Sequence, residues 1–231
     1  NDQLYDKLDE LRHKIVDIYE GKIQSKDPIF TAFADTFLHY EISKELPLIL
    51  IDGVEQDLHK TRFHNFKEIY DYSFKVASVV GLMTTPVFGY KDEQALNYAA
   101  DLGIAMQLTN ILRDVGEDVD RNRIYLAQDE LVAFGLTDQD ILCKRVDNRF
   151  IEFMKYQIKR AREYYERADK GISMLDRNAR LPVYLARYNY AKILDKIEEN
   201  NYDVFSSRAY LTKLEKLSIL PQIFYKINRA S

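Results

Sequence analysis

The sequence predicts an all-α fold, a single-domain helical bundle around a central pocket. Every long segment carries hydrophobic residues at spacings of three and four, and none shows the alternation of a convincing strand. Among 231 residues there are only 8 glycines and 5 prolines, and several of them lie where the helical patterns break. With 46% hydrophobic residues, the chain is long enough to bury one substantial core. We therefore expect residues 1–231 to form one helical domain that encloses a pocket.

The helical pattern begins at the first residues of the chain. Leu4, Leu8, Leu11, Ile15 and Ile18 recur at spacings of four and three. Because the pattern starts so abruptly, we expect that the sequence lacks an N-terminal part. In chain order, we expect helices at residues 2–21, 28–42, 47–58, 66–84, 91–116, 137–143, 147–171, 180–199, 203–217 and 219–228.

Local signals support several of these boundaries. Pro28 and Pro47 stand where the first turn of a helix tolerates proline. The segment 116–122 is expected to open a loop after the long fifth helix. Thr137 is expected to be an N-cap, because acidic residues that favour a helix N-terminus follow it directly.

Composition excludes some classes of function. The net charge is −4 and the basic residues are dispersed, which argues against a nucleic-acid partner. Cys143 is the sole cysteine, so an intrachain disulfide framework and a thiolate metal cluster are excluded. No apolar run approaches the ~20 residues that cross a bilayer, so no transmembrane segment is expected.

Four side chains with oxygen atoms form one stripe on the expected helix 91–116 and its continuation. Gln107, Asn110, Asp114 and Asp118 fall within an arc of roughly 80° at helical spacing. The two aspartates are like charges one turn apart, an arrangement that costs about 0.2–0.5 kcal/mol, so a compensating cation is expected. Magnesium, held by one or two carboxylates together with substrate phosphates, fits this need. A solvated helix face that binds nothing is the alternative, because a bare DxxxD pattern is common.

Longer motifs extend this stripe into a family resemblance. The segments QLTNILRDVGED and IYLAQDEL, the latter with Ala127 where proline is usual, resemble the second aspartate motif of the squalene and phytoene synthases, which are all-helical proteins of the isoprenoid synthase type. The QDEL ending is more similar to the phytoene branch. Further similar segments are residues 53–72, 76–90 and 200–217.

The resemblance implies an enzyme of carotenoid biosynthesis. Such a prenyltransferase joins two geranylgeranyl diphosphates head to head, through a cyclopropyl diphosphate, to phytoene. Mg²⁺ is the implied cofactor, with Mn²⁺ as a substitute, and no nicotinamide is expected because no G-x-G-x-x-G fingerprint occurs. The hydrophobic product implies peripheral contact with a membrane, and a plastid or a bacterial cytoplasm fits the phytoene branch.

The resemblance also assigns roles to residues. Asp114 and Asp118 correspond to the catalytic, metal-binding pair. The residues expected to bind substrate are Gln107, Asn110, Arg121, Asp57, Lys60, Arg62, Tyr202 and Arg208. For Arg121 an exposed ion pair with a neighbouring acid is the alternative, and for Asp57, Lys60 and Arg62 it is a solvated face.

The chain departs from the family pattern in two places. The first aspartate motif has no counterpart here, and Asp2 and Asp6 share its spacing without its flanking residues. Lys75 stands where the family has a tyrosine implicated in catalysis, and Ser78 replaces a glycine. A lysine ammonium would repel a carbocation unless it points to diphosphate, points outward or is neutral through burial.

Three functions remain open. The first is an active phytoene-type synthase of which this chain is a piece, with little activity of its own. The second is a catalytically silent relative that serves as a structural or assembly subunit for a protein partner. The third is a squalene-type synthase that uses farnesyl diphosphate, which the length of the prenyl tunnel would distinguish.

Overall fold

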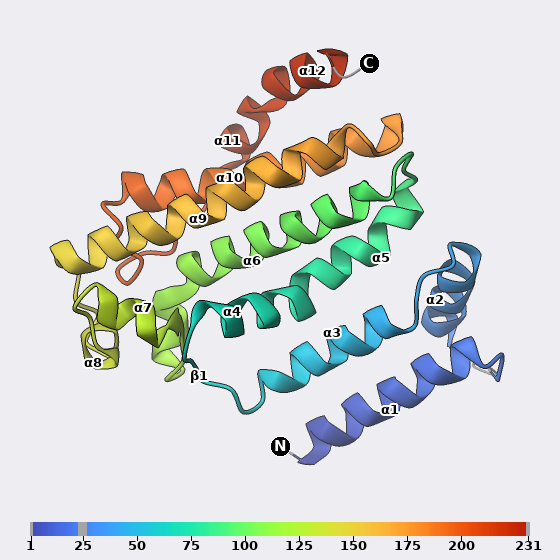
Figure 1. Cartoon of the computed structure of the whole chain (residues 1–231), viewed down its shortest axis with the longest axis horizontal. Coiled ribbons are helices and arrows are strands. Elements are labelled where there is room, and N and C mark those ends of the chain that lie inside the picture. Colours follow the sequence, from blue (N-terminus) through green and yellow to red (C-terminus); the bar gives the residue numbers. More distant parts are fainter. Residues whose placement is uncertain (1, 23–26, 230–231) are drawn as a thin grey trace.

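The computed structural model, which describes residues 2–22 and 27–229, is a bundle of helices laid side by side (Figure 1). A five-residue π-helix, η1 (Phe74–Ser78), joins α4 to α5. The α-helices are α1 (Asp2–Tyr19), α2 (Pro28–His39), α3 (Glu45–Gln56), α4 (Phe66–Ser73), α5 (Val79–Phe88), α6 (Gln94–Asp120), α7 (Gln128–Ala133), α8 (Asp138–Leu142), α9 (Asn148–Ile172), α10 (Arg177–Glu199), α11 (Lys213–Ser218) and α12 (Leu220–Arg229). The all-α prediction is confirmed.

Helix α6 lies at the centre of the bundle, with α5 on one side and α9 on the other (Figure 1). Its apolar face, including Ile104, Leu108 and Leu112, joins side chains of α9 such as Phe153 in the main buried core. Each such side chain contributes about 1.5–3 kcal/mol when fully buried. α6 is therefore held firmly on its apolar sides, which fixes the orientation of its polar stripe.

The expected end of this helix was wrong. Residues 116–122 were predicted to open a loop, yet α6 continues to Asp120. Gly116 lies within the helix, and a glycine is needed there because an added Cβ would lie 2.6 Å from the carbonyl oxygen of Val204. The glycine that looks like a helix stop in the sequence instead admits a close approach by another part of the chain.

The helix expected over 203–217 was also largely wrong. Residues 200–212, here called the strap, run without regular helix from α10 to α11, and only Lys213–Ser218 is helical. Backbone N–H groups of Phe205 and Ser206 donate to the Asp203 carboxylate at 3.0 and 2.9 Å, which stabilises a turn. A capping box between Thr212 and Glu215 then starts α11.

Two short strands were not predicted. β1 (Arg62–Phe63) pairs in parallel with β2 (Ile124–Ala127), and the backbone N–H of Ile124 donates to the carbonyl of Thr61 at 3.0 Å. Strands of two and four residues are too short to show alternation, and all four residues of β2 are buried. This pairing attaches the segment after α6 to the segment after α3.

The predicted helix 66–84 is one continuous path of α4, η1 and α5 that extends to Phe88. Ser78, at the end of η1, is fully buried, and its hydroxyl donates to the Ala100 carbonyl at 2.7 Å. Room for it comes from the facing helix, because a Cβ on Gly103 would lie 2.5 Å from the Ser78 Cα. Close approach is thus retained although serine replaces the family's glycine.

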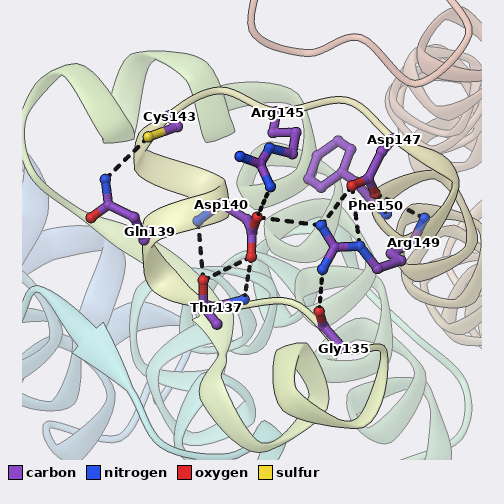
Figure 2. A network of polar contacts seen from close by, with 9 residues as sticks. All are labelled: Gly135, Thr137, Gln139, Asp140, Cys143, Arg145, Asp147, Arg149 and Phe150. Carbon is purple, nitrogen blue, oxygen red and sulfur yellow. Dashed lines mark hydrogen bonds and ion pairs between the residues drawn. The ribbon is translucent and has the colours of Figure 1, made fainter.

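Thr137 is the N-cap of α8, as predicted, within the polar network of Figure 2. Asp140 accepts from the backbone N–H and hydroxyl of Thr137 at 3.0 and 2.7 Å, and also from Arg145 and Arg149 at 2.8 and 3.3 Å. Arg149 further donates to the carbonyl of Gly135 at 2.6 Å. These contacts fix the corner between α7, α8 and α9.

The other predicted helices agree with the structure to within a few residues, whereas the short helix α7 was not predicted. α1, α2 and α3 share a separate small cluster in which Ile15, Ile18 and Ile51 are buried. No helix among the described residues is long and apolar enough to cross a membrane.

Candidate functional site

The structure places the two amides of the α6 polar stripe in the lining of an apolar cavity. Gln107 and Asn110 line this cavity, and the Asn110 amide nitrogen donates to the Gln107 side-chain oxygen at 3.3 Å. The Asn110 oxygen is buried without a hydrogen-bond partner among the described residues. A buried amide oxygen that lacks a donor is costly, so it is suited to a ligand group or a water molecule.

The cavity has a volume of about 400 Å³, which is in the range of small-molecule sites, and its lining is mostly apolar. Side chains of η1, α5, α6, α9 and α10 form the walls, and on α6 the lining runs from Ala95 to Asn110. Those fifteen steps correspond to about 22 Å of helix axis. The space is therefore elongated along α6, with amides at one end and hydrocarbon at the other.

Asp114, one turn beyond Asn110, is held by two arginines. Arg113 donates to both carboxylate oxygens at 2.7 and 2.5 Å, and Arg208 of the strap donates to one of them at 2.7 Å. Burial of Asp114 opposes its ionisation, but these hydrogen bonds outweigh burial and hold the pKa of its carboxyl below the usual value. At Asp114 the expected compensating positive charge is therefore supplied by Arg113 and Arg208. Arg113 was not singled out in the sequence, although it lies within the QLTNILRDVGED segment.

Asp118 differs from Asp114. Burial, the negative charge of Asp114 and, more weakly, that of Asp57 raise the pKa of the Asp118 carboxyl to about 6, although Arg121 and Arg123 oppose the shift. No donor among the described residues bonds to its carboxylate oxygens. This side chain therefore forms no ion pair with the nearby arginines and is suited to bind a cation.

Asp57 joins the site from the end of α3. Its two carboxylate oxygens accept from the hydroxyls of Tyr125 and Tyr72 at 3.0 and 3.2 Å, and its carbonyl accepts from Arg123 at 2.8 Å. Burial, and next the charge of Asp57, raise the pKa of both tyrosines, so both remain protonated donors. The two tyrosines were not predicted as site residues; Tyr125 lies in the IYLAQDEL segment, and position alone gave no reason to choose it.

Lys60 and Arg62 already have protein partners. The Lys60 ammonium pairs with Glu68 at 2.8 Å. Arg62 donates to Asp138 at 2.9 Å and to the carbonyl of Asn122 at 2.8 Å. These contacts connect β1 to neighbouring segments, so we leave both residues out of the site proposed below.

Arg121 and Tyr202 lie at the margin. Arg121 is the exposed C-cap of α6, not a continuation of the stripe, although its charge lowers the pKa of Asp118. Tyr202 has a positive φ of 62° in the strap, and its ring lies 5.9 Å from the Lys155 ammonium. Among the described residues, neither side chain forms a hydrogen bond or an ion pair with Asp114 or Asp118.

Lys75 faces α3. A Cβ on Gly53 would lie 2.9 Å from the Lys75 Cβ, and Lys75 is not among the residues that line the cavity. This geometry supports a Lys75 side chain that points away from the apolar cavity, which is the outward orientation. Asp6 lies on α1, and the side chain of Asp2 is outside the described part of the chain.

The donor set of the stripe fits magnesium only together with a phosphate ligand. Within the described residues no group of three or more His, Cys, Asp or Glu side chains is placed to hold a metal. Asn110, Asp114 and Asp118 supply hard oxygen donors on successive turns of α6, and Mg²⁺ commonly takes one or two carboxylates plus substrate phosphates. These residues therefore fit Mg²⁺ as part of a shared site.

Comparison with known proteins gives the family. The model of the family named squalene/phytoene synthase matches residues 1–215. The chain belongs to the squalene/phytoene synthase family. It is 42% identical over 225 residues to the chloroplastic phytoene synthase of Narcissus pseudonarcissus and 44% identical over 225 residues to phytoene synthase 1 of Zea mays. These matches cover 95% of this chain and 53% and 54% of the relatives, so the chain spans about half the length of the curated relatives it matches.

Solved structures of the family have the same fold. A dehydrosqualene synthase in complex with ligand superposes with a TM-score of 0.89 at 26% identity, over 96% of this chain and 78% of that one. Squalene synthase HpnC from Alicyclobacillus acidocaldarius superposes with a TM-score of 0.80 at 23% identity, over 85% of this chain and 74% of that one. The predicted isoprenoid synthase fold is thereby confirmed.

Proposed function

We propose that the whole protein is a Mg²⁺-dependent prenyltransferase that condenses two geranylgeranyl diphosphates head to head, through a cyclopropyl diphosphate, to phytoene. The observation that carries this proposal is that Asp114 and Asp118 continue the same helix one and two turns beyond Asn110, the last α6 residue that lines the elongated apolar cavity. A prenyl diphosphate has the same division, with a charged head and a long hydrocarbon tail. Similarity to curated phytoene synthases supports the choice of reaction.

The side chains of this chain would each act on one part of the substrate. The apolar walls take the tail and exclude water from the cation that forms when diphosphate leaves. Gln107 and Asn110 orient the head group, and the exposed Arg208 guanidinium is free to exchange its carboxylate partner for phosphate oxygens. Asp114 and Asp118 would hold Mg²⁺, which, when bound, neutralises charge that develops on the departing diphosphate.

The assay that tests this proposal uses the full-length protein with geranylgeranyl diphosphate and Mg²⁺, and detects phytoene by chromatography. We expect phytoene with Mg²⁺ and none after chelation. For the 231-residue chain alone we expect little or no product. The proposal fails if the full-length protein neither forms phytoene nor binds a geranylgeranyl thiodiphosphate in the presence of Mg²⁺.

A catalytically silent relative is the second candidate, and two observations favour it. Asp114 is already neutralised by Arg113 and Arg208, and Lys75 replaces the tyrosine of the family pattern. Such a protein would bind no Mg²⁺ at the stripe, which isothermal titration with and without the thiodiphosphate analogue distinguishes.

We also propose a plastid location and contact with a membrane surface, which the chloroplastic relatives and the hydrophobic product support.

A further inference from the structure

The end of the cavity farthest from the aspartates is built from small residues and two rings, those of Tyr98 on α6 and Phe88 on α5. Ala95 and Ala99 of α6, with Thr85 of α5, leave the space open, and Tyr98 is the only aromatic residue that α6 contributes to the described lining. From Asp114 to Tyr98 there are sixteen residues of helix, or about 24 Å. A tail whose head group lies at Asp114 therefore meets Tyr98 near its terminal isoprene unit.

Tyr98 has little freedom to move away. A Cβ on Gly171 of α9 would lie 2.9 Å from two atoms of the Tyr98 ring, Cγ and Cδ2, and would also clash with the Tyr98 Cβ. The base of the ring thus rests directly on the bare backbone of Gly171, which is buried. Contact with backbone is far less deformable than contact with a flexible side chain, so the base of the ring is held in place.

We propose that Tyr98, seated on Gly171, is the stop that sets the length of the prenyl chain. This inference rests on the proposed prenyl diphosphate function and names the residue that selects its substrate. A rigid ring limits the tail to a length that ends before it, and removal of the ring extends the space by part of an isoprene unit. Discrimination between chains that differ by one isoprene unit then depends on this position more than on the head-group residues.

The test uses the full-length protein and binding rather than turnover. Thiodiphosphate analogues with farnesyl, geranylgeranyl and geranylfarnesyl tails are titrated with Mg²⁺ present, and the ratios of their Kd values are compared. We expect Tyr98→Ala to improve geranylfarnesyl relative to geranylgeranyl by roughly tenfold, because space opens beyond the old stop. Tyr98→Trp should weaken geranylgeranyl relative to farnesyl by a similar factor.

Two controls separate fit from general damage. Tyr98→Phe keeps the ring and should leave all the ratios within about twofold, since only a hydroxyl is lost. Asn97→Ala, on an exposed position of the same turn, should leave the ratios unchanged. A variant that merely unfolds binds every analogue more weakly. It cannot favour the longer tails in Tyr98→Ala and the shorter tails in Tyr98→Trp.

The outcomes distinguish this inference from the function it rests on. If the wild-type protein binds the analogues but Tyr98→Ala and Tyr98→Trp leave the ratios unchanged, Tyr98 is not the stop and the proposed function stands. If the wild-type protein binds none of the analogues, the proposed function fails and the inference fails with it.

Discussion

The two halves of α6 are held in different ways. Its C-terminal half, from Asn110 to Asp118, presents charges, and its main partner there is Arg208, which lies 94 residues away in the sequence. Its N-terminal half lines the apolar cavity and packs closely on its neighbours, as where Gly103 faces Ser78 and Tyr98 rests on Gly171 of α9. The comparison teaches that one helix carries polar side chains for binding in one half and close apolar packing in the other. Substitutions in the polar half should change binding more than stability, and those in the apolar half should do the reverse.

The strongest way to break the polar half is to remove one charge of the aspartate pair. Asp114→Asn or Asp118→Asn in the full-length protein should lower turnover by roughly a hundredfold or more, because an amide binds Mg²⁺ poorly. Helical content measured by circular dichroism should remain that of the wild type. Turnover equal to the wild type in either variant would remove that residue from the metal site.

Loss of Arg208 should weaken binding by a smaller factor. In Arg208→Ala we expect the affinity for geranylgeranyl thiodiphosphate to fall roughly tenfold, since one charge-assisted contact is lost. Stability should change by no more than about 1 kcal/mol, because the Arg208 side chain is 48% exposed. Calorimetric titration and thermal denaturation measure the two effects, with Lys213→Ala on exposed α11 as the control. A large loss of stability with unchanged affinity would make Arg208 purely structural.

A substitution in the apolar half of α6 should lower stability more than it lowers binding. Gly103→Ala places a methyl group 2.5 Å from the Cα of Ser78, and we expect it to lower the free energy of unfolding by about 1–3 kcal/mol. Urea denaturation of this variant beside Asp118→Asn tests the contrast directly. The comparison would be wrong if Asp118→Asn destabilised the protein more than Gly103→Ala does.

The raised pKa of Asp118 predicts a pH dependence of the metal-free protein. Its carboxyl has a pKa of about 6 in the fold and an ordinary value of 3.8 when exposed, so the folded state binds more protons in that window. Stability should therefore fall as the pH rises from about 4 to about 6, by roughly 1 kcal/mol after allowance for solvent screening. In Asp118→Asn this decline should be absent. Thermal denaturation of both proteins between about pH 4 and about pH 6 measures this. A decline in stability of equal size in the variant would show that another group causes it.

The smallest effect is expected at Lys75. Because its Cβ faces Gly53 and it does not line the cavity, Lys75→Tyr should change turnover of the full-length protein by less than about twofold. Steady-state kinetics with geranylgeranyl diphosphate measure it. A large gain in activity would show that the ammonium reaches the reacting cation and that the lysine is inhibitory.

Several features of the fold and site followed from the sequence. The helices, the Thr137 cap and the stripe from Gln107 to Asp118 depend on spacings of three and four, which are local properties of the chain. The extension of α6 past Gly116 was missed because a helical glycine and a terminal glycine look alike until the facing backbone is known. The strap was missed because residues 203–212 have helical spacing but find their partners outside a helix.

By itself the sequence determined that the chain is helical, that it belongs with the synthases it resembles, and that four oxygen-bearing side chains share one face. Only the tertiary structure decided that Arg113 and Arg208 neutralise Asp114 while Asp118 has no such partner, and that Asp57 binds the hydroxyls of Tyr72 and Tyr125. The physical reason is range. A helix repeats within a few residues, whereas the pairing of charges and the shape of a cavity depend on segments that meet only when the chain folds.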